Sequence, residues 1–193
     1  MNNLGAHLLK RLLIALSMAS ALALSAVPAA AQKVRLATSA GDIVLELDAA
    51  KAPKTVENFL AYVRAKHYDG LIFHRVIDGF MLQGGGFKPD MTEKPVRAPI
   101  VLESRNGLPN LRGSIAMART NVPDSATSQF FINVADNTRL DAAEGRDGYA
   151  VFGRVVQGMD VVDKIRLVPV TSKGPHQNVP ATPVVITKAS LEK

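Results

Sequence analysis

Cysteine is missing from all 193 residues of the chain. Its absence excludes disulfide bonds, thiolate metal sites, a cysteine nucleophile and a lipid-modified cysteine. Charge is modest as well, since 23 Lys and Arg are scattered among 17 Asp and Glu, for a formal net charge of +6. With no basic run and no ladder of aromatic residues, the chain lacks the usual features of a nucleic-acid-binding protein. After residue 31, no stretch is apolar over the ~20 residues that a membrane-spanning helix needs.

Several catalytic motifs are also absent. The chain has no G-x-S-x-G turn for a serine nucleophile and no H-E-x-x-H pair for zinc. QGGGFKPD is not a phosphate-binding loop, because Lys88 is followed by Pro89 rather than by serine or threonine. The loop acids show no evident pairing for acid–base work: Glu103, Asp124 and Asp141. These absences favour a binding module, or an enzyme whose reaction breaks no covalent bond.

The N-terminus has the pattern of a secretory signal. Lys10 and Arg11 precede an uncharged apolar run over residues 12–27, and Ala29 and Ala31 have the A-x-A spacing of a cleavage site. An uncleaved membrane anchor is the alternative, but the run is short for a bilayer. We therefore predict a cleavable signal peptide over residues 1–31 and one domain over residues 32–193. The mature protein is expected in the periplasm, with secretion as the alternative, without stable membrane association.

Periodicity predicts a domain built mainly from strands. Residues 34–48 alternate around a turn at residues 39–42, and residues 52–70 change to helical spacing. A second short helix is predicted over residues 159–168. Further strands are expected at residues 72–77, 80–83, 114–118, 128–134, 149–156 and 183–190, and long loops at residues 88–99, 119–127 and 169–183. This pattern favours an all-β fold, an eight-stranded antiparallel closed β-barrel capped by two α-helices.

The segment FHRVIDGFMLQGGGF, residues 73–87, contains an unexpected charge. Asp78-Gly79 is typical of a hairpin turn between two strands. Arg75 lies in the first strand among apolar residues, where an unpaired guanidinium would be costly to bury. Arg75 therefore needs a partner or a function. The glycines at residues 84–86 indicate a bend where backbone or ligand approaches closely.

Four segments in order resemble the cyclophilins, the cyclophilin-type peptidyl-prolyl cis–trans isomerases: residues 73–87, GSIAMAR, SATSQFFINV and YAVFGRVVQGMD. The resemblance covers residues 34–189, and RAKHYDGLIFHRV and GPHQNVPATPVVI are similar to the exported bacterial branch. It implies the same eight-stranded barrel and, as the reaction, rotation about X–Pro bonds, which needs no metal and no cofactor. The expected partners are proline-containing polypeptides, as unfolded or folding exported proteins, and the expected state is a monomer.

The resemblance also assigns roles to individual residues. Arg75 would be catalytic, because its guanidinium can hydrogen-bond the proline nitrogen once the amide twists and the nitrogen regains a lone pair. Gln83 would orient Arg75, and the backbone of Arg119 would bind the peptide as a partial added strand. The full set of implied substrate-binding residues is Phe80, Met81, Gln83, Ala118, Arg119, Gln129, Phe131, Arg139, Leu140 and Tyr149.

Some neighbouring residues are expected to be structural. Phe130 and Phe131 must point to opposite faces of a strand, so Phe131 is placed in the substrate pocket and Phe130 in the core. Phe73 and Ile132 are also expected in the core. His74 is interpreted as structural, because the reaction requires no proton transfer.

Two positions depart from the family's best-known pattern. Arg139 replaces a tryptophan that many members have before the pocket leucine, and Tyr149 replaces a histidine. Tyr149 keeps a ring and a hydroxyl. Because an arginine offers less apolar contact than an indole, the chain is expected to bind cyclosporin, an inhibitor of many members, only weakly.

Two other functions are weighed against an isomerase. A chaperone or scaffold could bind proline-containing peptides without useful catalysis, but the presence of Arg75 and Gln83 favours the enzyme. A barrel that binds small molecules fits less well, because the polar groups lie in strand-edge motifs suited to a peptide backbone.

Overall fold

The computed structural model describes residues 32–192, and these form one compact unit. Two α-helices are present in this part of the chain, α2 (Pro53–Arg64) and α3 (Met159–Arg166). The short 3-10 helices are η1 (Pro123–Ser125) and η2 (Thr138–Leu140). The strands are β1 (Lys33–Thr38), β2 (Gly41–Leu47), β3 (Phe73–Ile77), β4 (Met81–Gly84), β5 (Ser114–Met117), β6 (Phe130–Asn133), β7 (Val151–Gln157), β8 (Val170–Lys173), β9 (His176–Pro180) and β10 (Ile186–Leu191).

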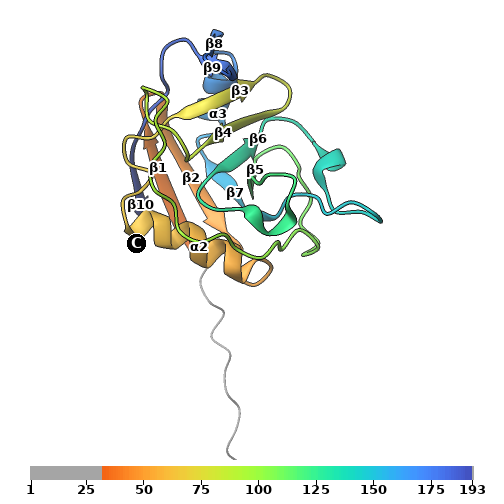
Figure 1. Ribbon diagram of the computed structural model, residues 1–193. Coiled ribbons are helices and arrows are strands. Elements are labelled where there is room, and N and C mark those ends of the chain that lie inside the picture. Colours follow the sequence, from red (N-terminus) through yellow and green to blue (C-terminus); the bar gives the residue numbers. More distant parts are fainter. Residues whose placement is uncertain (1–31, 193) are drawn as a thin grey trace, which may run out of the picture. The chain divides into compact units, whose positions relative to one another are not determined.

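Eight strands form a single antiparallel sheet in the order β10-β1-β2-β7-β5-β6-β4-β3 (Figure 1). Its two end strands, β10 and β3, are not joined by a regular ladder. An isolated bridge links Ile72 to Val185, and the Phe73 N–H donates to the carbonyl of Val184 at 3.0 Å. The all-β prediction with eight main strands and two helices is confirmed, but "closed" overstates the regularity of the seam. The sheet is better described as a half-barrel whose open side is bridged by irregular chain.

The helices cover the sheet where the sequence predicted them. In α2, Val56, Phe59 and Val63 are buried on one face. Pro53 occupies the first turn, where backbone N–H groups have no partner within the helix, so the missing N–H of proline costs no hydrogen bond. Figure 1 shows α2 lying across one end of the sheet. The shorter α3 contacts β2, β3 and β4, with Val162 and Ile165 buried. No helix among residues 32–192 is long and apolar enough to cross a membrane.

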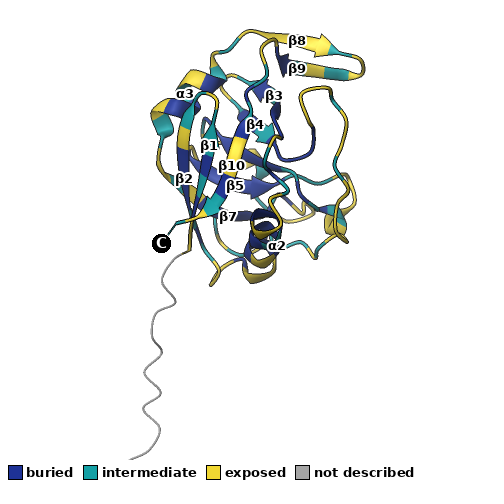
Figure 2. Cartoon of the chain, turned by 90° about the vertical axis from the view of Figure 1, so that its left-hand side faces the viewer, coloured by how far each residue is buried: buried dark blue, intermediate teal, exposed yellow. Residues whose placement is uncertain are grey.

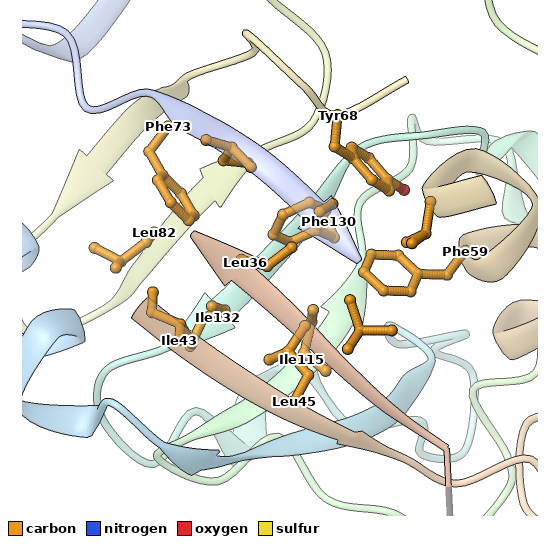
Figure 3. Packing of buried hydrophobic residues seen from close by; sticks show 14 of the residues in the cluster. Leu36, Ile43, Leu45, Phe59, Tyr68, Phe73, Leu82, Ile115, Phe130 and Ile132 are labelled. Atoms are coloured by element: carbon orange, nitrogen blue, oxygen red, sulfur yellow. The ribbon is translucent and has the colours of Figure 1, made fainter. Parts of the chain in front are cut away.

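The main core fills the space between the concave face of the sheet and α2. Figure 3 shows Leu36, Ile43 and Leu45 of the β1–β2 hairpin facing side chains from β5 and β6, with Phe59 of α2 beside them. Phe59 and Phe130 meet edge to face at 5.7 Å. Phe73, Phe130 and Ile132 are fully buried in this cluster, so the structure supports their predicted core positions.

The segment 169–183 was wrongly predicted to be a loop. It forms a separate hairpin in which Val170 pairs with Pro180 and Thr171 with Val179. Most of its residues are exposed, as Figure 2 shows for β8. Because so few of its side chains are buried, the segment has no apolar alternation from which a strand could be recognised.

A register shift at His74 reorients strand β3. The pairing of β3 with β4 is irregular between Phe73 and Arg75 and regular from Arg75 to Ile77. Phe73 and Val76 can therefore both enter the main core although they are three residues apart. Arg75 is left on the other face of the strand, only partly buried. The irregularity allows a charged side chain within an otherwise apolar strand pair.

Candidate functional site

A second apolar cluster lies on the sheet apart from the main core. Its buried members are Met81, Ala116, Phe131 and Val151, from the neighbouring strands β4, β5, β6 and β7. We call this group and its partly buried neighbours the site cluster; the neighbours are Ile77, Phe80, Leu108, Ala118, Leu140 and Tyr149. Strand alternation explains the two clusters, because Phe130 and Leu82 enter the core while Phe131 and Met81 face the opposite side. The site cluster forms a partly exposed apolar surface over the centre of the sheet.

Arg75 lies at one border of the site cluster and is held by amide side chains. Arg75 and Gln83 are directly opposite on β3 and β4, and the Arg75 Nη1 donates to the Gln83 Oε1 at 3.4 Å. Gln83 Nε2 donates in turn to Gln129 Oε1 at 2.9 Å. No carboxylate among the described residues forms an ion pair with Arg75. The guanidinium therefore keeps its charge and most of its donors for a ligand.

Two arginines stack on the aromatic walls of the site cluster. Phe131 and Tyr149 meet edge to face at 5.6 Å, and the guanidinium carbon of Arg119 lies 4.8 Å from the centre of the Tyr149 ring. At another wall, the guanidinium carbon of Arg139 lies 4.8 Å from the centre of the Phe80 ring. Such stacking orients a guanidinium without neutralising its charge.

A buried amide network, which sequence reasoning missed, supports the loop that carries Arg139 and Leu140. Asn137 Nδ2 donates to the Phe80 carbonyl at 2.8 Å and to the Asn133 Oδ1 at 2.7 Å. Asn133 Nδ2 donates to Asn110 Oδ1 at 3.2 Å. All three asparagines are buried, so each lost bond would leave a polar group unsatisfied. The network joins η2 to the end of the β3–β4 turn, and only the cluster of asparagines at residues 133 and 137 could have indicated it.

The glycine run that follows β4 allows the chain to pack closely against Ser128 and Gln129. Gly85 has φ +84°, a conformation that side chains rarely adopt, and a Cβ there would lie 2.9 Å from the carbonyl oxygen of Ser128. A Cβ on Gly86 would lie 2.7 Å from the Gln129 Nε2. The groups that approach the glycines closely are therefore the backbone of Ser128 and the side chain of Gln129, and this packing supports Gln129.

His74, next to Arg75, has the environment of a structural residue. Its ring lies 4.6 Å from that of Phe87, which in turn lies 4.8 Å from His176. The buried Nδ1 has no hydrogen-bond partner in the described part of the chain. Burial, followed by the charges of His176 and Arg75, lowers the pKa of His74 to about 4. The imidazole is thus neutral near pH 7, and the structure supports the structural role predicted for it.

The residues predicted from the resemblance gather around one surface. Phe80, Met81, Ala118, Phe131, Leu140 and Tyr149 all belong to the site cluster, Arg75, Gln83 and Gln129 form the adjoining chain of polar side chains, and Arg119 and Arg139 stack on the cluster's rings. Among residues 32–192, no group of three or more His, Asp or Glu is placed to hold a metal ion. The arrangement offers an apolar surface, a guanidinium and paired amides, which suits binding and twisting of a peptide bond.

Known proteins resemble this chain in both sequence and structure. The family described as "Cyclophilin type peptidyl-prolyl cis-trans isomerase/CLD" matches residues 33–191. A peptidyl-prolyl cis–trans isomerase of Streptomyces antibioticus is 61% identical over 161 residues, 82% of this chain and 97% of that protein. Peptidyl-prolyl cis–trans isomerase A of Dickeya dadantii is 58% identical over 160 residues, 83% of this chain and 84% of that protein.

A solved structure with the same fold is the cyclophilin-type peptidyl-prolyl cis–trans isomerase of Cryptosporidium parvum. It superposes with a TM-score of 0.74 at 28% identity and covers 84% of this chain and 98% of that one. A second structure of that protein, determined in the presence of the dipeptide Ala-Pro, gives a TM-score of 0.73. With the family match over nearly the whole described region, the chain belongs to the cyclophilin-type family and is a peptidyl-prolyl cis–trans isomerase.

Proposed function

We propose that the site cluster and Arg75 form the active site, and that the substrates are proline-containing segments of exported proteins. The observation that carries the site assignment is the unneutralised Arg75 guanidinium, held by Gln83 beside an apolar cluster outside the core. X–Pro rotation faces a barrier of ~18–20 kcal/mol because the amide loses its resonance. A donor aimed at the proline nitrogen stabilises the twisted amide more than the planar one.

The remaining site residues would hold the substrate in place. The proline ring would lie on Phe80, Met81, Phe131 and Leu140, whose apolar side chains it would cover. The N–H of Ala118 already donates to the Gln129 carbonyl at 3.0 Å, so the backbone of Arg119 remains to pair with the extended peptide. A roughly 10⁵-fold acceleration needs about 7 kcal/mol of transition-state stabilisation, within reach of one aimed donor together with apolar contacts that cover the proline ring.

The test of this site is exchange spectroscopy or a protease-coupled assay on X–Pro peptides, combined with mapping of the bound peptide by chemical shifts. The largest shifts are expected at Arg75, Phe131 and Tyr149. The α2 face carrying Arg64 is the matched control surface, because it lies outside the site cluster. Shifts concentrated around Arg64 in a protein that still catalyses exchange would place the active site elsewhere.

The proposal that this protein is itself exported depends on its N-terminal residues. The predicted signal peptide, residues 1–31, lies outside the residues that the structure describes, and the family match begins at residue 33. Its charge, apolar run and A-x-A spacing support export to the periplasm. N-terminal sequencing of protein recovered from the periplasm should give Gln32 as the first residue. A chain that stays in the cytoplasm and starts at Met1 would contradict both cleavage and export.

A further inference from the structure

Three guanidinium groups border the site cluster, one from each of three segments. Arg75 belongs to β3, Arg119 follows β5, and Arg139 lies in η2. None of them takes part in an ion pair with a carboxylate of residues 32–192. By contrast, Arg35 and Arg166, which are not among the residues packed in the cluster, each contact two acids. The three guanidinium groups beside the site cluster therefore carry positive charge that no direct ion pair within residues 32–192 offsets.

Arg119 is held in place by groups that carry no charge. Its Nε donates to the Gly148 carbonyl at 2.9 Å, and its Nη1 donates to the Thr120 carbonyl at 2.8 Å. Its guanidinium also stacks on Tyr149. These contacts fix the side chain and satisfy some of its donors, but the positive charge remains at the wall of the cluster.

Arg139 is more exposed and less constrained. Its guanidinium stacks on Phe80, and the Arg139 side chain forms no hydrogen bond with another residue of the range 32–192. Asp141, two residues further along the loop, forms no direct ion pair with Arg139, and its Oδ1 instead accepts both the backbone N–H and the side-chain Nδ2 of Asn110, at 2.7 and 2.9 Å. All five N–H donors of Arg139 are consequently open to a ligand.

We propose that this isomerase prefers proline segments with an aspartate or glutamate within two residues of the proline, and that Arg119 and Arg139 determine that preference. The proposal rests on the placement of the peptide over the site cluster. A segment lying there would bring its neighbouring side chains within reach of both guanidinium groups. Complementary charge at such exposed positions contributes mainly to selection among substrates.

The experiment compares kcat/KM for three peptide sets that differ only in the residues flanking the proline: alanine, glutamate or lysine. For an exposed pair, an effect of about three- to fivefold per arginine is expected, and therefore about 9- to 25-fold for glutamate over alanine when both arginines act. Lysine should act in the opposite direction. Raising the salt from 0.05 to 0.5 M should reduce the ratio, because the screening length falls to a few ångströms.

The variants Arg119→Gln and Arg139→Gln should each lower the glutamate-to-alanine ratio, and the double variant should bring it near one. Using the ratio removes any general effect of the variants on catalysis. Arg64→Gln is the matched control, because it removes the same charge from an exposed position on α2. A glutamate preference that survives in the double variant, or that Arg64→Gln lowers equally, would overturn the proposal. Loss of activity on all peptides through altered site geometry would instead bear on the proposed active site.

Discussion

At the residue scale, Arg75 has only one direct side-chain hydrogen bond to other residues of the range 32–192, the 3.4 Å contact with Gln83. Arg75→Ala should therefore fold normally, because it breaks no ion pair and removes nothing from the main core. Loss of one preorganised donor typically lowers kcat by ~10²–10³. We expect that loss in a peptide exchange assay, together with an unchanged urea unfolding midpoint.

The control for Arg75→Ala is Arg154→Ala, which removes an exposed arginine that pairs with Glu46 on the β2–β7 ladder. Exposed pairs of this kind contribute ~0–1 kcal/mol, and Arg154 lies outside the site cluster. Full activity is expected in this control. If Arg75→Ala kept more than about a third of the wild-type kcat/KM at equal stability, Arg75 would not be the catalytic group.

Arg139 gives a second prediction at this scale, which concerns cyclosporin. The exposed guanidinium over Phe80 must be ordered to contact the inhibitor, which costs ~0.5–1.5 kcal/mol, and it offers less apolar surface than an indole. Together these effects should weaken inhibition by about 2–3 kcal/mol, roughly 30- to 150-fold. Arg139→Trp should restore much of that loss.

The inhibition constants of the wild type and Arg139→Trp should be measured in the same isomerase assay. Catalysis should change much less than inhibition, since Met81, Phe131 and Leu140 remain in the site cluster. Tight inhibition of the wild type, or equal inhibition of the two proteins, would show that Arg139 does not determine cyclosporin affinity.

At the scale of elements, the two glycines that follow β4 should affect different properties. Substitution of Gly85 should lower stability, and substitution of Gly86 should lower activity. Gly85→Ala requires an unfavourable φ of +84° and places a methyl group against the Ser128 carbonyl, so it should lower the free energy of unfolding by about 1–3 kcal/mol. At Gly86 the three atoms nearest to a methyl group all belong to the Gln129 side chain, which can move. Gly86→Ala should therefore leave stability nearly unchanged but disturb the Gln83–Gln129 bond and lower kcat/KM by about three- to tenfold.

Urea unfolding and peptide exchange measured on both glycine variants would check this contrast. Equal loss of stability in the two variants would mean that Gln129 cannot move away from the added methyl group. Unchanged activity in Gly86→Ala would mean that the Gln83–Gln129 contact does not position Arg75.

The elements also show how far the sequence alone could lead. Regular burial produced recognisable patterns, so α2, α3 and the eight main strands were predicted where they occur. The β8–β9 hairpin was missed because it pairs only with itself and is mostly exposed. The register shift at His74 was also unpredictable, since it depends on how β3 meets β4 in three dimensions.

For a similar reason, the sequence predicted some parts of the candidate site and not others. Arg75, Gln83 and Phe131 come together because regular pairing places Gln83 opposite both of the others. The network of Asn110, Asn133 and Asn137 joins three separate segments, and hydrogen bonds between distant amides leave no periodic pattern in a sequence.

At the scale of the whole molecule, buried histidine should make folding sensitive to mild acid. In the unfolded chain a histidine titrates near its ordinary pKa of 6.5, whereas burial lowers the pKa of His74 to about 4. The unfolded state therefore binds a proton more readily between these values. Stability should be complete above about pH 6.5 and fall as the pH decreases toward 4, by about 3 kcal/mol for His74.

The measurement is the free energy of unfolding by urea at pH 7, 5.5 and 4.5, for the wild type and His74→Phe. Phenylalanine has a ring of similar size but no titrating group, so the variant should lose less stability on acidification. Burial lowers the pKa of His67 as well, so part of the slope should remain. Asp90 and Asp163 have pKa values below their ordinary 3.8 and should contribute only at lower pH, which keeps the window from pH 6.5 to 4 specific to histidine. The same pH dependence in both proteins would show that His74 is not buried as a neutral ring.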